Sequence, residues 1–137
     1  MLGFKHMNIK KRMVAAVTLS FSLLAAPAIA ANWVYVAEST SNAVYYYDSE
    51  TIRRSGNQVT VWEKYDFSRD KTEKRRERKV RYRYDCEQRT DTLLETVSYY
   101  PNGKIEKFTF DTYEQKESAV TPDTVSEAML EAVCGLN

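Results

Sequence analysis

The segment from Arg78 to Glu87 constrains the fold of this chain more than any other stretch. Its side chains alternate between apolar and polar. The apolar set falls on one side of an extended chain and consists of Val80, Tyr82, Tyr84 and Cys86. The polar set falls on the other side and consists of Lys79, Arg81, Arg83 and Asp85. Because a period of two is typical of a half-buried β-strand, the segment predicts a strand with a core face and a mainly cationic outer face.

Further alternating or β-branched runs surround this strand. The predicted strands span residues 33–38, 43–47, 58–67, 78–87, 93–100 and 104–110. Asn102 and Gly103 join the last two, and Asn-Gly between alternating runs is the strongest short hairpin signal. Since the connections are too short for parallel crossovers, the sequence predicts an antiparallel meander sheet of about six strands.

The C-terminal residues predict one short helix. Thr121 with Pro122, or Thr124 with Glu127, can cap its N-terminus, and Gly135 can end it. The apolar stripe of this helix consists of Val125, Met129, Ala132 and Val133. We therefore expect an α+β fold in which the helix packs on one face of the sheet. No predicted helix covers the second face, which must be solvated or used for contact.

The N-terminal residues have the features of an export signal. Basic residues 10–12 precede an apolar run over residues 13–26, and residues 28–30 are the small residues that signal peptidase requires. The run is too short for a stable membrane-spanning helix. We expect residues 1–30 to be a cleaved signal peptide, with Met7 as an alternative start. Because the apolar run is short and is expected to be removed, we expect no membrane span. Because Ala31 and not a cysteine follows the cut, we also expect no lipid anchor.

Removal of the signal leaves residues 31–137, which is the size of one ordinary domain. The signal contains four of the basic residues and none of the acidic ones, so its removal changes the formal charge from +1 to −3. We therefore expect a soluble, net negative, single-domain protein that is periplasmic or extracellular.

Two cysteines, Cys86 and Cys134, are the only ones in the chain. Export to an oxidising compartment favours a disulfide between them, which would join the central strand to the C-terminal helix. Two free thiols or a metal pair are the alternatives. Because the sequence has no C-x-x-C motif and no Cys/His cluster, the disulfide is the favoured interpretation.

A basic segment leads into the central strand. Its candidate binding residues are Lys74, Arg75, Arg76, Arg78, Lys79, Arg81 and Arg83. Such a segment can bind sulfated glycans, acidic protein surfaces or nucleic acid, and it can equally be a solvated loop. Export argues against nucleic acid, so we expect a protein or a sulfated glycan as partner if the segment is functional.

Three consecutive tyrosines, Tyr45, Tyr46 and Tyr47, form a second candidate. Because neighbours in a strand point to opposite faces, at least one of them must leave the core face. An exposed tyrosine can anchor a protein interface or can serve only as a cross-strand partner. The sequence leaves both roles open.

Catalysis finds little support in the sequence. The single histidine is His6, which precedes the predicted cleavage site, so the mature chain lacks the commonest general base and metal ligand. No G-x-S-x-G motif or glycine-rich phosphate loop occurs. We therefore expect a binding protein without a cofactor or a metal, and not an enzyme.

The order of several short motifs resembles the surface-adhesin protein E family. The motifs are Trp33-Val34, Tyr45 to Asp48, Ile52 with Gly56, Val59 to Trp62, Tyr84 to Cys86, Tyr99-Tyr100 before Gly103, and Pro122 followed by Val133-Cys134. The resemblance covers essentially residues 31–137. It implies a sheet of about six strands, one C-terminal helix and a Cys86–Cys134 disulfide.

For function, the resemblance implies export by a Gram-negative bacterium and an adhesin-like role in binding host protein or glycan. The sheet face without a helix and the basic segment would provide the contacts. Adhesins of this kind are displayed as lipoproteins, whereas Ala31 replaces the lipidated cysteine here. The second hypothesis is therefore a periplasmic envelope accessory protein with a bacterial partner. The sequence does not determine the oligomeric state.

Overall fold

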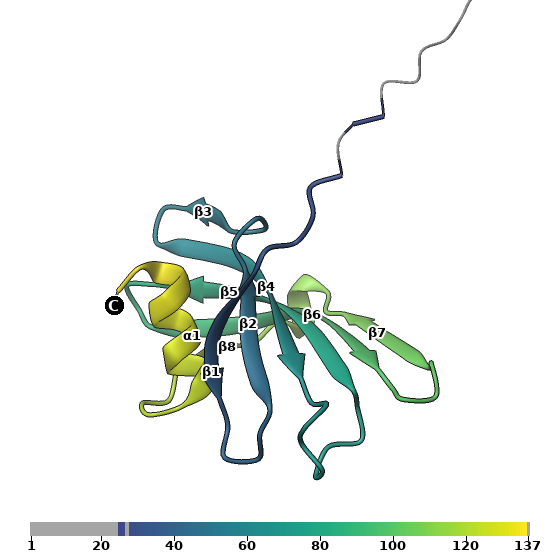
Figure 1. The fold of residues 1–137 in the computed structure, drawn as a ribbon. Helices are drawn as coiled ribbons and strands as arrows, with labels where there is room; N and C mark the ends of the chain where they lie inside the picture. Colours follow the sequence, from purple (N-terminus) through teal and green to yellow (C-terminus); the bar gives the residue numbers. More distant parts are fainter. Residues whose placement is uncertain (1–24, 27, 137) are drawn as a thin grey trace, which may run out of the picture.

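The computed structural model describes residues 25–26 and 28–136. The predicted signal peptide, residues 1–30, lies mainly outside the described residues. The described residues form eight strands, one short 3-10 helix (η1) and one α-helix (Figure 1). The elements in chain order are β1 (Trp33–Glu38), β2 (Val44–Asp48), β3 (Arg53–Ser55), β4 (Gln58–Asp66), β5 (Glu77–Asp85), β6 (Thr90–Tyr99), β7 (Ile105–Thr109), η1 (Thr112–Glu114), β8 (Glu117–Ala119) and α1 (Val125–Cys134).

All eight strands belong to one antiparallel sheet. Its main path runs β1-β2-β4-β5-β6-β7, so the predicted six-stranded meander is confirmed. The sequence analysis missed two short strands. β3 pairs with the start of β4 and β8 with the start of β6, and both are only three residues long. The predicted central strand, β5, lies in the middle of the sheet between β4 and β6 (Figure 1).

Two glycine turns hold successive strands in register. Gly56 follows β3 with φ 58°, and Ser55 pairs with Gln58 across this turn. Gly103 has φ 88° in the connection between β6 and β7. Because positive φ costs little only at glycine, these two positions specify where the chain reverses.

Helix α1 begins and ends where the cap residues place it. The Thr124 side chain accepts a hydrogen bond from the Glu127 backbone N–H, so the second of the two predicted caps is the one used. Gly135 adopts the left-handed conformation and ends the helix, as predicted. No helix among the described residues is long and apolar enough to cross a membrane.

The core lies between α1 and one face of the sheet. Its fully buried members are Val59, Val61, Tyr84, Met129, Leu130 and Val133. The sequence analysis omitted Leu130 from the helix stripe, although this side chain has no exposed surface. Cys86 and Cys134 form a disulfide that ties the residue after β5 to the last residue of α1, which confirms the predicted bond. Arg54 also donates a hydrogen bond to the Val133 carbonyl at 2.6 Å.

Candidate functional site

The strand register divides the sheet into two chemically different faces. The inner face packs against α1 and carries Val59 and Val61 of β4. Since side chains alternate along a strand, the open face on the opposite side carries Trp62 and Lys64. No helix of the described residues covers this open face. Its side chains are mostly half-buried, which is typical of a solvated sheet surface.

One line of paired residues crosses the open face perpendicular to the strands, and we call it the cross-strand row. Successive backbone pairs join β1 to β2, β2 to β4, β4 to β5, β5 to β6 and β6 to β7. The row consists of Tyr35, Tyr46, Lys64, Lys79, Val97 and Lys107. Aromatic residues therefore occupy one end of the row, and three lysines occupy the rest of it around one valine.

The two central lysines lie over aromatic rings. The Lys64 Nζ atom lies 5.0 Å from the centroid of the Trp33 ring and 4.5 Å from that of Tyr46. The Lys79 Nζ atom lies 5.8 Å from the same Trp33 centroid and 5.2 Å from that of Tyr99. Both ammonium groups thus lie over the same indole ring. Cation–π attraction holds such groups in place at the surface and contributes about 0.5–1 kcal/mol per pair at exposed sites.

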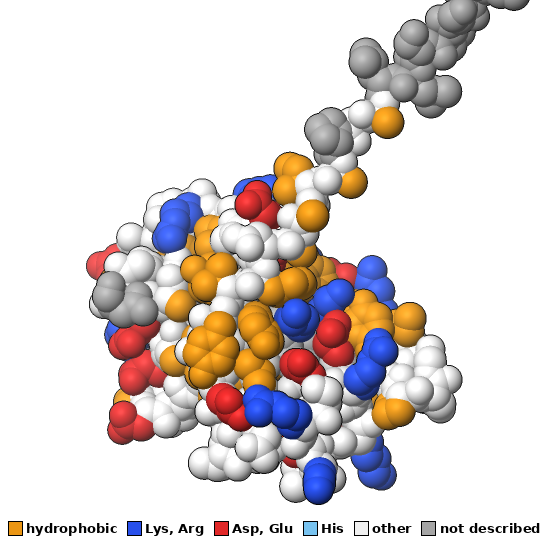
Figure 2. Space-filling view, viewed as in Figure 1, with side chains coloured by type: hydrophobic (Ala, Val, Ile, Leu, Met, Phe, Trp, Pro, Cys, Tyr) orange, Lys and Arg blue, Asp and Glu red, His pale blue; other side chains and the backbone are white. Residues whose placement is uncertain are grey.

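Ion pairs occupy the neighbouring part of the open face. The Glu95 carboxylate forms ion pairs with Arg81 at 3.3 Å and with Lys107 at 3.2 Å, so one carboxylate balances two cations. Arg81 also lies over the Trp62 ring at 5.9 Å. In contrast, Lys64 takes part in none of the ion pairs found among the described residues. Figure 2 shows hydrophobic side chains gathered over β1 and β2, with charged side chains beside them.

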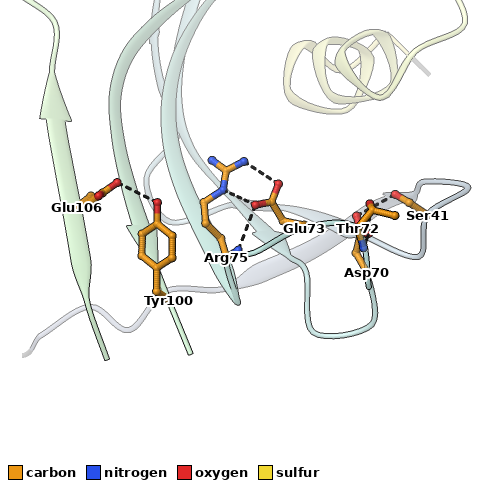
Figure 3. A network of polar contacts seen from close by, with 7 residues as sticks. All are labelled: Ser41, Asp70, Thr72, Glu73, Arg75, Tyr100 and Glu106. Atoms are coloured by element: carbon orange, nitrogen blue, oxygen red, sulfur yellow. Dashed lines mark hydrogen bonds and ion pairs between the residues drawn. The ribbon is translucent and has the colours of Figure 1, made fainter. Parts of the chain in front are cut away.

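The loop between β4 and β5 is held by polar contacts within the loop and with the connection between β1 and β2 (Figure 3). Asp70 accepts hydrogen bonds from the hydroxyls of Ser41 at 2.9 Å and Thr72 at 2.6 Å. Glu73 accepts two hydrogen bonds of 2.8 Å from the Arg75 guanidinium. These bonds are the main reason that the pKa of Glu73 falls to about 2. The first part of the predicted basic segment, residues 74–76, therefore belongs to an ordered loop in which Arg75 is already paired, and the rest of the segment lies in β5.

The inner face contains a buried carboxyl group. Glu63 is 1% exposed, and it accepts hydrogen bonds from the hydroxyls of Tyr84 and Tyr65, the latter at 2.7 Å. Burial raises the pKa of Glu63 to about 7, and the two tyrosine hydrogen bonds oppose that rise. Burial also raises the pKa of Tyr82 to about 12. Glu63 and Tyr84 are closed off from solvent, whereas Tyr65 and Tyr82 are half-buried. No pocket is found in the part of the chain that the structure describes.

The cluster also lacks the composition of a metal centre. Among residues 25–26 and 28–136, no group of three or more histidine, cysteine, aspartate or glutamate side chains is placed to hold a metal ion. The inner face therefore offers a buried proton-binding group, and the open face offers aromatic and cationic groups at the surface.

Comparison with known proteins identifies the family of this fold. The family model described as surface-adhesin protein E matches residues 33–135, which span every strand and the helix. The chain belongs to the surface-adhesin protein E family. No curated protein shows significant sequence similarity to the chain.

Solved structures of protein E from Haemophilus influenzae share the fold of this family member. Crystal form II superposes with a TM-score of 0.53 at 19% identity, covering 81% of this chain and 94% of that one. A second structure of Haemophilus influenzae protein E gives 0.53 at 15% identity, covering 80% and 88%. Protein E from non-typeable Haemophilus influenzae gives 0.51 at 15% identity, covering 80% of each chain. At such identities the likeness shows the fold alone.

In this surface-adhesin protein E family member, the predicted binding residues lie in three places, which are the open face, the loop before β5 and the inner face. Tyr46, Lys79, Arg81 and Arg83 lie on the open face, because they pair with or alternate alongside Lys64 and Trp62. Lys74 and Arg76 are exposed in the loop before β5. Arg75 lies in the same loop, paired with Glu73. The three places do not form one continuous patch of free cations.

The other three predicted binding residues lie on the inner face of the sheet. Tyr45 and Tyr47 pack against the core, because they flank Tyr46 and alternation directs them toward α1. Arg78 pairs with Tyr65 and Ser98 on the inner face, and its Nε atom is buried without a hydrogen-bond partner. The strand period that places Lys79 on the open face therefore places Arg78 on the inner face.

Six residues of the open face were not predicted as binding residues from the sequence. The missed residues are Trp33, Trp62, Lys64, Glu95, Tyr99 and Lys107. Each belongs to a strand that was predicted, so the alternation within each strand was available as a signal. The missing information was the register between strands, because only the pairing shows that Trp33, Lys64 and Lys79 meet.

Proposed function

We propose that this family member is an exported, adhesin-like binding protein of a Gram-negative bacterium. It contacts a host protein or glycan through the open face of its sheet. The observation that carries the proposal is the surface around Trp33, where Lys64 and Lys79 are held over aromatic rings on a face that no described helix covers. Family membership supports the adhesin-like role.

The open face suits binding better than the other candidate surfaces. Aromatic residues and arginine are enriched at protein interfaces, and Trp62 with Arg81 provides both in contact. In the loop, by contrast, Arg75 is already satisfied by Glu73. The exposed Lys74 and Arg76 lie just before β5 and would add long-range attraction to an acidic partner.

The buried carboxyl group does not support a catalytic role. Glu63 has a pKa near neutrality, which a general base needs, but it is enclosed by Tyr65 and Tyr84 and has no access to a substrate. The raised pKa therefore belongs to the core of the fold. We infer that this protein is not an enzyme.

The test is binding of the exported protein to immobilised host matrix proteins and to heparin. The variant Lys64→Glu with Lys79→Glu reverses the two central charges. We expect it to lose binding, whereas Lys71→Glu with Lys116→Glu changes the charge equally at two exposed positions outside the β-strands and should retain it. Equal loss in both variants would mean that net charge, and not the open face, determines binding.

The second candidate is a periplasmic envelope accessory protein with a bacterial partner. Ala31, which stands where a lipidated cysteine would follow the predicted cleavage site, favours it. Cell fractionation separates the two candidates, because an adhesin must reach the outside of the cell. Recovery of the protein only in the periplasmic fraction would favour the accessory role.

A further inference from the structure

The cross-strand row has the spacing of a binding site for an extended chain. Adjacent strands in a sheet lie about 4.8 Å apart. Lys64 and Lys79 occupy adjacent strands, and Lys107 lies two strands farther along the same line, beyond Val97. The row therefore presents positive charges at successive points of one line that runs perpendicular to the strands.

The charges of the row are only partly neutralised. Aromatic rings lie against the ammonium groups of Lys64 and Lys79, and both side chains stay partly exposed to solvent. Lys79 meets Glu77 at 3.6 Å, and Lys107 shares Glu95 with Arg81. Ammonium groups that the fold has already ordered lose less side-chain entropy when an anion binds.

An exposed aromatic ring lies at the other end of the row. Tyr35 is 59% exposed, and its ring packs edge-on against Tyr46 with centroids 6.2 Å apart. Tyr46 in turn contacts the Lys64 ammonium group. A sugar ring can place its apolar C–H face on such a ring while a substituent sulfate reaches the neighbouring ammonium group. A string of acidic side chains would use the lysines but would leave the exposed ring without a partner.

We propose that the cross-strand row binds a linear sulfated polysaccharide, which lies across the strands from Tyr35 toward Lys107. The proposal rests on the proposed function, because it assigns the chemical class of partner to the same open face. An extended ligand fits because the row crosses the sheet from β1 to β7 and no pocket interrupts the surface of the described residues. Sulfate is favoured because the row offers separate cations and no closed cavity for a single anion.

The experiment measures the affinity of the full exported protein for size-fractionated heparin oligosaccharides across a salt series. Affinity should rise with oligosaccharide length until the chain spans the row. Unsulfated heparosan of equal length should not bind measurably. Lys64→Gln with Lys79→Gln should weaken heparin binding about tenfold and should lower the slope of log affinity against log salt by about 2. Tyr35→Ala should weaken binding without changing that slope.

Lys71→Gln with Lys116→Gln is the matched control, and both variants must keep the disulfide and the circular dichroism spectrum of the wild type. Equal weakening in the control and the row variant would overturn the proposal. So would equal affinity for heparosan, or binding to poly-glutamate with no binding to heparin. In that last case the row variant would lose poly-glutamate binding, and the proposed function would stand with a protein partner. If the row variant bound every ligand as well as the wild type does, both the row proposal and the proposed function would be overturned.

Discussion

Tyr46 and its neighbours Tyr45 and Tyr47 are chemically identical, yet they lie in opposite environments. Tyr45 and Tyr47 pack against the core on the inner face, where Tyr45 meets Tyr65 with ring centroids 4.8 Å apart. Tyr46 lies on the open face and supports the Lys64 ammonium group. The comparison teaches that strand parity, and not residue type, separates side chains that stabilise this fold from side chains available for contact.

The charged residues of the two faces follow the same division. On the inner face, one carboxyl group, Glu63, is enclosed by tyrosines, and burial raises its pKa to about 7. On the open face, Lys64 and Lys79 lie over aromatic rings at the surface. Inner-face changes should therefore alter the free energy of unfolding, and open-face changes should alter binding.

Removal of the disulfide should have the largest effect on the free energy of unfolding. Cys86 and Cys134 pack against the inner-face core. Replacing Cys86 and Cys134 by serine removes a crosslink between residues 48 positions apart. In the chain-entropy model, this change lowers the free energy of unfolding by about 4 kcal/mol. Urea unfolding followed by circular dichroism measures the loss. A difference below about 1 kcal/mol would show that α1 is held by packing alone.

A cavity under the helix should have the next largest effect. Leu130 is completely buried, so Leu130→Ala should lower the free energy of unfolding by about 3 kcal/mol. Val97→Ala on the half-buried open face is the matched control and should cost less than about 1 kcal/mol. Urea unfolding of both variants measures the contrast. Similar losses would contradict the assignment of the core to the inner face.

The buried carboxyl group should make stability depend on pH. The pKa of Glu63 is raised from 4.5 to about 7 in the folded protein, so the folded state binds this proton more tightly than the unfolded state. Its contribution to stability is therefore full below pH 4.5 and is lost as the pH rises through 7.

Glu63→Gln mimics the protonated group and should remove this dependence. Relative to the variant, the wild type should lose about 3 kcal/mol of unfolding free energy between pH 4.5 and 8. Chemical unfolding across this pH range provides the measurement. Parallel pH profiles for the two proteins would mean that Glu63 is ionised in the folded state with an ordinary pKa.

The adjacent tyrosines give a paired test with a moderate effect. Tyr47→Ala should lower the free energy of unfolding by about 2 kcal/mol, because it removes a ring that packs against the core. Its folded fraction should bind heparin as the wild type does. Tyr46→Ala should show the reverse, with a smaller loss of stability and weaker heparin binding. Thermal unfolding measures the stability of the two variants, and titration calorimetry measures their heparin binding. Weaker binding in Tyr47→Ala with a larger stability loss in Tyr46→Ala would contradict the prediction.

The smallest expected effect on stability is at Lys64. Lys64→Gln removes two cation–π contacts at the surface and should lower the free energy of unfolding by about 1 kcal/mol, which is the lower end of the range for two such contacts. Urea unfolding is precise enough to measure this loss. A loss as large as that of Leu130→Ala would mean that the lysine is structural, and the open face would lose its central cation as a binding group.

Much of the fold could be predicted from the sequence because its signals are local. Alternation indicated the six main strands, Asn102-Gly103 indicated a hairpin, and Thr124 with Gly135 indicated the helix ends. β3 and β8 were missed because segments of only three residues carry no periodic signal, and their pairing depends on β4 and β6.

The candidate site was predictable only in part, because its residues meet only when the strands pair in the correct register. Alternation within β5 correctly placed Lys79, Arg81 and Arg83 outside, and the same rule would have placed Arg78 inside. Nothing local to Trp33 predicts that Lys64 and Lys79 lie over its ring, since β2 and β4 must first pair with their neighbours. The contacts of Glu63 with Tyr65 and Tyr84 depend on tertiary packing in the same way.

The most direct test of the account is amine-acylation footprinting of the folded protein with and without saturating heparin. The account predicts protection of Lys64 and Lys79 on the open face, with unchanged reactivity at Lys71 and Lys116. Mass spectrometry of the peptides quantifies each lysine separately. Protection confined to Lys71 and Lys74, with Lys64 and Lys79 equally reactive in both states, would contradict it and would assign contact to the loop before β5.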